Sequence, residues 1–211
     1  MRRAVILANG VPPRRETLEQ ALAGASLFVC ADGGANAAVR YGLRAPNAIV
    51  GDFDSADQAT LDHFRDTPKA RDDSTEHNDA KKAVDWTLAR GAFDEIILLG
   101  ATAGRLDHVL GHISLLYRYR DRVRIILEDD AVKAWLASGS VTLDEPAGTV
   151  VSFFAVGVPA ESVTTENLEY SLRNCRLELG SQDSISNVVA STPARVMIGW
   201  GHLVFVVVKQ P

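Results

Sequence analysis

Short apolar runs alternate with helix-like segments through the first 128 residues. The apolar runs, each typical of a buried strand, are residues 4–7, 27–31, 48–50, 95–99 and 123–127. Segments typical of helices lie around them, at residues 14–22, 35–41, 57–64, 78–89 and 106–119. Buried strands that alternate with helices predict a mainly parallel sheet covered by helices on both faces. We therefore expect an N-terminal α/β domain whose ligands bind beyond the carboxyl ends of the strands.

The pattern changes after about residue 128. Strand-like segments follow one another without a clear helix between them, at residues 132–136, 150–156, 168–172, 195–198 and 202–208. Gly, Pro, Ser and Asn separate them, as in a β-sandwich or barrel. The sequence thus predicts an α/β domain over residues 1–128 and a C-terminal all-β sandwich domain over residues 129–211. The polar stretch 65–78 is predicted to be a mobile loop.

Charge and cysteine content narrow the classes of function. The chain carries a net charge of −5 and shows no basic face of the kind that nucleic-acid binders use. An acidic protein that binds an acidic substrate such as ATP must offset the negative charge, and a divalent cation is the usual means. Cys30 and Cys175 have no partners at metal-ligand spacing, and no apolar run reaches membrane length. We expect a cytoplasmic protein with reduced thiols, which binds neither membranes nor nucleic acid.

Two candidate segments follow the second and third predicted strands. Residues 32–36, Asp-Gly-Gly-Ala-Asn, allow the backbone to approach an anion closely at a helix start, although Asp-Gly-Gly is also a common turn. Asp52 and Asp54 are two residues apart and point the same way in an extended backbone, which suits a hard cation. The alternative for this second segment is a solvated loop that caps the next helix through Ser55 or Asp57. Two like charges at the end of an apolar strand repel each other unless a cation lies between them, which favours the cation site over the solvated loop.

Two further segments precede predicted helices. Glu76 and Asp79 lie three residues apart at a helix start, where acids also stabilise the helix dipole, and Lys82 lies about one turn further on. Residues 100–108, Gly-Ala-Thr-Ala-Gly-Arg-Leu-Asp-His, combine small residues with Arg105, which can hold phosphate oxygens in a bidentate way. This second segment lacks the Gly-Lys-Ser/Thr of a Walker loop and the glycine spacing of a dinucleotide fingerprint. Acids, an arginine and glycine-rich turns together favour phosphate or diphosphate transfer.

The ordered set of segments resembles the thiamine pyrophosphokinase family. The segments that carry this resemblance are residues 31–36, 51–55, 78–79 with 82–83, 100–108, 168–172 and 184–187. The resemblance implies a homodimer with the active site at the subunit interface, in which a β-sandwich domain contributes to the thiamine pocket. It also implies Mg²⁺-dependent transfer of a diphosphate from ATP to the hydroxyl of thiamine, which yields thiamine diphosphate and AMP.

The resemblance also implies roles for individual residues. The magnesium-associated acids would be Asp52, Asp54, Glu76 and Asp79. The nucleotide would contact Asp32, Gly33, Asn36, Lys82, Arg105 and His108. The residues closest to the chemistry would be Asp54, Arg105 and Asp107, with Asp107 near the thiamine hydroxyl. The thiamine pocket would be lined by Ser184, Ser186 and Asn187.

The chain departs from the family pattern at several positions. Glu76 replaces the usual Asp, Asn78 the usual Thr, and Ala103 a frequent Gly. His112 stands where the family often has Asn, and Asn167 where Gly commonly precedes the Leu-x-Tyr segment. Two alternatives follow from the same residues: a diphosphokinase acting on another heterocyclic alcohol such as a pterin, and a non-catalytic thiamine or nucleotide sensor.

Overall fold

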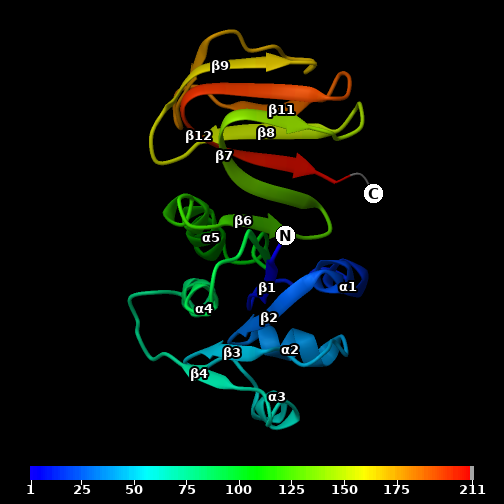
Figure 1. Cartoon of the computed structure of the whole chain (residues 1–211), viewed down its shortest axis with the longest axis vertical. Helices are drawn as coiled ribbons and strands as arrows, with labels where there is room; N and C mark the ends of the chain where they lie inside the picture. The colour runs from blue at the N-terminus through cyan, green and yellow to red at the C-terminus, as the bar shows by residue number, and fades with distance from the viewer. Residues whose placement is uncertain (210–211) are drawn as a thin grey trace. The chain divides into compact units, whose positions relative to one another are not determined.

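The computed structural model describes residues 1–209 and divides into two units, Met1–Asp130 and the chain from Ala131 onward. We call them the α/β unit and the β unit. In Figure 1 the α/β unit runs from blue to green, and the β unit from light green to red.

The α/β unit is built on a six-stranded parallel sheet. Its strands are β1 (Arg3–Leu7), β2 (Ala25–Ala31), β3 (Ala48–Gly51), β4 (Lys69–Arg71), β5 (Glu95–Leu99) and β6 (Arg124–Glu128). They lie side by side in the order β6-β5-β1-β2-β3-β4, and every neighbouring pair is parallel. The chain builds outward from β1 through β2 to β4 and then returns to the other side of β1. The direction of winding therefore reverses between β1 and β5, where ligands bind in open α/β sheets.

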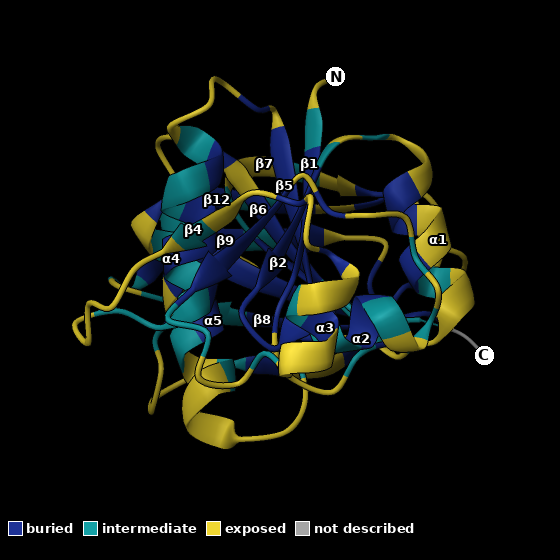
Figure 2. Ribbon diagram, turned by 90° about the horizontal axis from the view of Figure 1, so that it is seen from below, coloured by how far each residue is buried: buried dark blue, intermediate teal, exposed yellow. Residues whose placement is uncertain are grey.

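Helices cover both faces of this sheet. They are α1 (Arg15–Ala23), α2 (Gly34–Arg40), α3 (Gln58–His63), α4 (Asp79–Leu88) and α5 (Leu106–Arg118). In Figure 1, α4 and α5 lie on one side of the strands and α1 and α2 on the other. Figure 2 shows the strands between them as buried and the outward faces of the helices as exposed. Removing several large side chains such as Phe28 and Ile49 fully from water contributes about 1.5–3 kcal/mol each.

The β unit is mostly antiparallel. Its strands are β7 (Val132–Leu143), β8 (Val150–Ala155), β9 (Ala160–Glu166), β10 (Cys175–Leu177), β11 (Ser184–Val188) and β12 (Ala194–Val208). The long strand β12 pairs with β7 along both of its halves, with β9 along its first half and with β8 along its second. The register shifts between Ile198 and Leu203, where a side chain at Gly201 would collide with the Pro159 carbonyl oxygen. Strands β10 and β11 pair with β9 and β8.

The predicted fold class is confirmed: an α/β region with parallel strands comes first, and a mostly antiparallel β region follows. The predicted strand at 168–172 is wrong. Leu168 forms only an isolated bridge with Val189, and the Asn187 side chain, rather than a ladder of backbone bonds, holds the Tyr170 backbone. Of the alternating large residues in this segment, Leu168 is buried whereas Tyr170 is 60% exposed, so the alternation does not mark a strand.

The sequence pattern did not predict several of the strands. Strand β4 lies inside the predicted loop 65–78. It is a short, polar strand at the edge of the sheet, where pairing of its backbone with β3 is enough to hold it. Strands β9, β10 and β11 are polar or short, and the two segments predicted at 195–198 and 202–208 are one strand, β12. Among the described residues, no helix is long and apolar enough to cross a membrane.

Candidate functional site

A cavity of about 720 Å³ opens at the carboxyl edge of the parallel sheet. Its walls come from four places in the chain: the loop after β1, the end of β2 with the loop after β3, the start of α4, and the segment from Ala103 to His112 after β5. All of these segments follow strand ends or begin helices. The cavity therefore lies where the reversal of strand order predicts a ligand, and helix starts supply free backbone N–H groups to it.

Glycines let the loops approach one another at this edge. A Cβ atom at Gly10 would lie 2.2 Å from the Gly100 carbonyl oxygen, and one at Gly34 would lie 2.1 Å from the Leu7 carbonyl oxygen. No other residue fits at either position without moving the backbone. The Gly-Gly turn after β2 is thus required by packing against the end of β1.

Asp32 is fully buried and adopts a left-handed backbone conformation, with φ of 44°. The backbone N–H of Ser55 donates to its Oδ2 at 3.1 Å, whereas its Oδ1 has no hydrogen-bond partner. Burial raises the pKa of Asp32 to about 6, and the nearby carboxylates add to the shift. A buried carboxylate oxygen without a donor is costly, which makes it a natural ligand for a cation.

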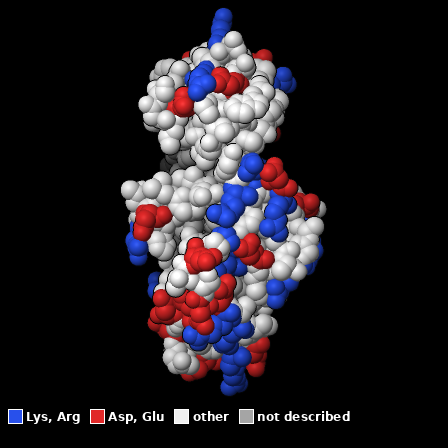
Figure 3. Space-filling view, turned by 90° about the vertical axis from the view of Figure 1, so that its left-hand side faces the viewer, with Lys and Arg blue, Asp and Glu red and all other residues white. Residues whose placement is uncertain are grey.

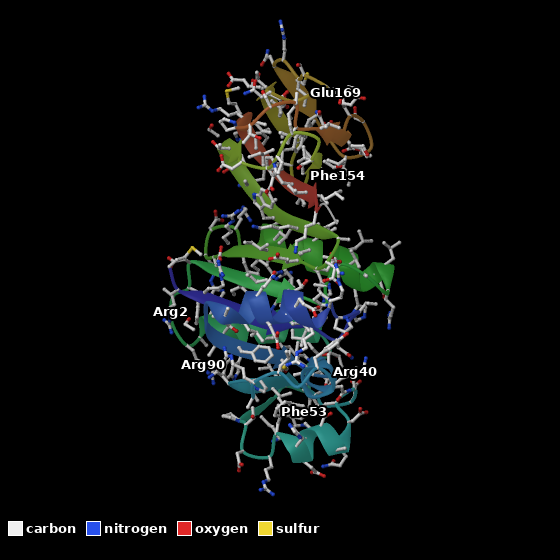
Figure 4. The ribbon with its side chains drawn as sticks, turned by 90° about the vertical axis from the view of Figure 1, so that its right-hand side faces the viewer. Arg2, Arg40, Phe53, Arg90, Phe154 and Glu169 are labelled. Carbon is white, nitrogen blue, oxygen red and sulfur yellow. The ribbon has the colours of Figure 1, made fainter. Side chains whose placement is uncertain are left out.

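Asp52 and Asp54 project from the loop after β3. Phe53 lies between them with φ of 67° and packs against the core, and it is labelled in Figure 4. The backbone N–H of Asp54 donates to Asp52 Oδ1 at 3.2 Å. Each of Asp32, Asp52 and Asp54 offers one oxygen, and these atoms all lie within 4.8 Å of one another. Three converging carboxylates suit a hard divalent cation such as Mg²⁺, and the free Asp32 oxygen fits that assignment.

Lys82 is held behind this carboxylate group. Its side chain is almost completely buried, and its Nζ lies 3.0 Å from Asp79 Oδ1 and 3.7 Å from Asp52 Oδ2. Burial lowers the pKa of Lys82, but the hydrogen bond and charge of Asp79 outweigh it and raise the pKa overall. The lysine therefore stays charged.

Figure 3 shows acidic side chains gathered over part of the α/β unit, with basic ones among them.

Asp79 and Glu76 have different surroundings from the three carboxylates. Asp79 lines the cavity and accepts a hydrogen bond from Lys82, and Asn78 caps α4 by accepting from the Lys81 N–H at 2.9 Å. Glu76 is exposed, and its backbone N–H donates to Ser74 Oγ at 3.3 Å. Within the described residues, the structure brings neither acid into the group formed by Asp32, Asp52 and Asp54.

The start of α5 carries an exposed ion pair. Arg105 Nη2 donates to Asp107 Oδ2 at 2.6 Å, and its Nε donates to the other carboxylate oxygen at 3.2 Å. The hydrogen bond from Arg105 lowers the pKa of Asp107 to about 2. Arg105 and His108 both line the cavity. Arg105 is thus placed where it can exchange a carboxylate for phosphate oxygens.

Asn36 and Gly33 shape the loops without lining the cavity. Asn36 Nδ2 donates to the Ser55 carbonyl oxygen at 2.9 Å, and its Oδ1 accepts from the Asp57 N–H at 3.0 Å. A Cβ atom at Gly33 would lie 2.5 Å from the Asn9 side chain. Both predicted nucleotide contacts therefore hold neighbouring loops in position in this structure.

The three predicted thiamine-pocket residues lie on β11 in the β unit. Asn187 is buried, and its Nδ2 donates to the Tyr170 carbonyl oxygen at 2.8 Å while its Oδ1 accepts from the Tyr170 N–H at 3.1 Å. Ser184 is also buried and lies 3.4 Å from Asn187 Nδ2. Ser186 is exposed, with φ of 55° and its N–H donating to Ser152 Oγ. The Asn187 amide therefore fixes the backbone of Tyr170, and Ser152 holds the backbone of Ser186.

Sequence reasoning missed cavity residues from two segments. Asn9 and Gly10 follow β1, and His112 lies on the second turn of α5. A signal for the first pair existed: they follow a buried strand as the other candidate segments do. His112 was noted only as a departure from a family pattern, because a single histidine in a helix does not reveal which way it faces.

Two family models match the chain. The model of the thiamin pyrophosphokinase catalytic domain matches residues 18–127, and that of the thiamin pyrophosphokinase vitamin B1 binding domain matches residues 140–202. The first contains all of the cavity-lining carboxylates described above, and the second contains β11.

Individual proteins agree with these matches. Thiamine pyrophosphokinase 1 of Oryza sativa subsp. japonica is 29% identical over 202 residues, which cover 82% of this chain and 75% of that protein. Thiamine pyrophosphokinase of Bacillus subtilis (strain 168) is 26% identical, over 76% of this chain and 78% of that one. The crystal structure of thiamin pyrophosphokinase from Geobacillus thermodenitrificans superposes with a TM-score of 0.84 at 26% identity, covering 100% of this chain and 98% of that one.

Proposed function

Because the chain belongs to the thiamin pyrophosphokinase family, we propose that its α/β unit uses Mg²⁺ to move a diphosphate from ATP to the hydroxyl of thiamine. Its activity is that of a thiamine pyrophosphokinase, since both family domains are present and relatives with this activity match most of the chain. The observation that carries the metal-dependent part is the convergence of three carboxylates on the cavity edge, one of them with an unpaired buried oxygen.

Asp32, Asp52 and Asp54 would hold the magnesium ion. Bound there, Mg²⁺ would neutralise negative charge on the triphosphate. Asp79 keeps Lys82 charged and directed at this group, so that the lysine adds a fixed positive charge beside it. Glu76 lies on the exposed approach to α4, from which it would reach the metal only through water.

The glycine-rich loops and Arg105 bind the phosphates of ATP. The backbone N–H groups of Leu106 and Asp107 at the start of α5 can bind phosphate oxygens, and His108 lies on the same first turn and lines the cavity. The guanidinium of Arg105 binds the transferring phosphates when it leaves Asp107. Positioning and charge neutralisation account for most of the catalysis in reactions of this class.

Asp107 orients the thiamine hydroxyl rather than strongly deprotonating it. The hydroxyl oxygen forms a bond to the β-phosphorus of ATP, the bond from that phosphorus to the α,β-bridging oxygen breaks, and AMP leaves. A carboxylate is a weak base even at its ordinary pKa, so Asp107, once Arg105 has left it, accepts a hydrogen bond from the hydroxyl. The hydroxyl proton passes to solvent water as the new bond to phosphorus is completed, which a loose transition state permits.

We also propose a homodimer with the active site at the subunit interface. Leu106 and Leu110 follow Arg105 on one face of α5 and are 71% and 58% exposed. Large exposed apolar side chains on the helix that follows Arg105 and carries His108 favour coverage by a second copy of the chain. Light scattering should give twice the monomer mass, and a Leu106→Glu/Leu110→Glu variant should give the monomer mass. A monomeric wild type would contradict this assembly.

The cellular location proposed for this enzyme is the cytoplasm. Both cysteines are free thiols, and burial raises the pKa of Cys30, so that this thiol stays protonated. Fractionation of cells with an antibody against the protein tests the location, and recovery outside the cytoplasm would contradict it.

Incubation with ATP, Mg²⁺ and thiamine tests the reaction directly. AMP and thiamine diphosphate should appear in equal amounts, and EDTA should abolish both. A hydroxymethyl pterin in place of thiamine should give no AMP. Binding of ATP and thiamine without AMP release would identify a sensor, and AMP release with the pterin alone would identify another diphosphokinase.

A further inference from the structure

His112 is a histidine held rigidly in the cavity wall. It lies on the second turn of α5 and is only 5% exposed. Its Nδ1 is 2.8 Å from the carbonyl oxygen of Ala101, just after β5. It is one of the residues that line the cavity. The ring is therefore anchored at one nitrogen to the edge of the sheet at the point where strand order reverses.

This anchor fixes the tautomer of His112. A carbonyl oxygen only accepts hydrogen bonds, so Nδ1 carries the proton and donates it. Burial lowers the pKa of His112 and, together with the neighbouring ring of His108, 6.3 Å away, outweighs the hydrogen bond to Ala101, which raises the pKa. The imidazole is therefore neutral near pH 7, and its Nε2 is a hydrogen-bond acceptor.

Nε2 has no partner within the described part of the chain. The only hydrogen bond of the ring there is the one from Nδ1 to Ala101. The enclosed polar atoms without partners include Asp32 Oδ1 but not His112 Nε2, so Nε2 keeps access to open space. The cavity is the open space that His112 borders.

The chemistry of ATP determines what such an atom can bind. Phosphate oxygens are acceptors near neutral pH and offer nothing to an unprotonated nitrogen. The donors suited to those oxygens are the cationic groups of Lys82 and Arg105, which now pair with Asp79 and Asp107. We propose that His112 is a specificity residue whose Nε2 accepts a hydrogen bond from the nucleoside of ATP, either from the adenine amino group or from a ribose hydroxyl. This inference rests on the proposed use of ATP.

Ratios of kcat/KM between nucleotides test the assignment without depending on how much of each variant folds. The substrates are ATP, 2′-deoxy-ATP, 3′-deoxy-ATP and purine riboside triphosphate, which lacks the amino group. In the wild type, the analogue without the bonded group should be about two- to tenfold poorer than ATP, as for one neutral hydrogen bond. His112→Phe should bring that ratio close to one. His112→Gln, which can still accept, should retain part of the preference.

His63→Phe is the matched control, because His63 is an exposed histidine of α3 outside the cavity lining. It should leave the ratios at their wild-type values. The inference is overturned if the wild type uses all four nucleotides equally, or if His112→Phe lowers turnover while every ratio stays unchanged. An effect of His112→Phe on the thiamine KM alone would also overturn it.

A second measurement separates this inference from the proposed function. Calorimetric titration with AMP, its two deoxy analogues and purine riboside monophosphate requires no turnover. If the wild type discriminates among them and His112→Phe does not, the specificity role stands even when no thiamine diphosphate is formed. Equal binding of all four by the wild type would reject the role of His112 while leaving the enzyme activity intact.

Discussion

Asp32 of the α/β unit and Asn187 of the β unit are both buried polar side chains in segments that the sequence marks as functional, yet their hydrogen bonds differ. Asp32 has one carboxylate oxygen bound by a backbone N–H and the other without a partner. Asn187 uses its carbonyl oxygen for two backbone N–H groups and its amide nitrogen for a backbone carbonyl. Asp32 thus has an oxygen free for a ligand, whereas the hydrogen-bonding groups of Asn187 are already used within the protein.

This difference separates two ways of building a site. In the α/β unit, holding like charges close together and burying one of them lowers the stability of the fold. A bound ligand compensates for this burial. In the β unit, the buried amide of Asn187 holds the backbone of Tyr170 in its conformation. Substitutions at the first kind of residue should therefore affect activity, and those at the second should affect stability.

Asp54→Ala should show the largest effect. Loss of one of three cation ligands is expected to lower AMP release by about a thousandfold, equivalent to about 4 kcal/mol. Because Asp54 is exposed, the unfolding midpoint should stay within the scatter of the wild type. Coupled AMP detection and urea unfolding measure the two effects. Asp57→Ala is the control, since the Asp57 side chain makes no capping bond; near-wild-type turnover in Asp54→Ala would contradict the metal assignment.

Asn187→Ala should lower stability and leave nucleotide binding by the α/β unit unchanged, which is the reverse of Asp54→Ala. It leaves the N–H and carbonyl of Tyr170 without partners and should lower the free energy of unfolding by about 2–4 kcal/mol. Hydrogen exchange at the Tyr170 amide should rise, while AMP binding to the α/β unit should be unchanged. Asn174→Gly serves as the control because Asn174 has a positive φ of 50° that glycine tolerates. Loss of AMP binding with normal stability would reverse the roles of the two regions.

Asp107→Asn should lower turnover by about ten- to a hundredfold, or about 1.4–2.7 kcal/mol, with little change in ATP binding. The Arg105 hydrogen bond holds the pKa of Asp107 at about 2, so this group stays ionised throughout an ordinary assay. The pH profile of wild-type kcat/KM, which reports the free enzyme, should therefore show no acid limb from Asp107 above about pH 3. Asp66→Asn, at a fully exposed acid, is the control. Unchanged turnover in Asp107→Asn would remove this residue from the chemistry.

Asp85→Asn should show that the α/β unit also contains purely structural polar groups. Asp85 accepts hydrogen bonds from Lys81 Nζ and Tyr119 Oη, both at 2.7 Å, and joins α4 to the end of α5. The substitution should cost about 1–2 kcal/mol of stability near pH 7, with normal KM values.

The cost of Asp85→Asn should depend on pH. Burial raises the pKa of Asp85, but the bonds from Lys81 and Tyr119 lower it overall. A carboxyl with a lowered folded-state pKa stabilises the protein above its unfolded pKa of about 4, and this stabilisation disappears as the pH falls further. Urea unfolding from pH 7 down to acid should show the variant approaching the wild type. Asp121→Asn, at an exposed acid, should show no such trend.

The sequence determined the elements that repeat a clear pattern. Fully apolar runs such as β5 and the helical spacing of α5 specify their structure locally, because burial demands the same periodicity wherever the element packs. The four candidate segments could also be found, since three follow apolar strands and all four carry charged side chains beside small residues. Polar strands such as β4 and β9 could not be found, because backbone pairing with a neighbour leaves no mark in residue type.

The tertiary structure alone decided the state of each polar side chain. From the sequence, Asp32, Asp52 and Asp79 were similar acids at strand or helix ends. Packing against the ends of β1 and β3 buried Asp32 and left one of its oxygens unpaired, while Lys82 took Asp79 as its partner. Whether a charge is solvated, paired or free for a ligand depends on which distant residues surround it, and only the folded chain brings those residues together.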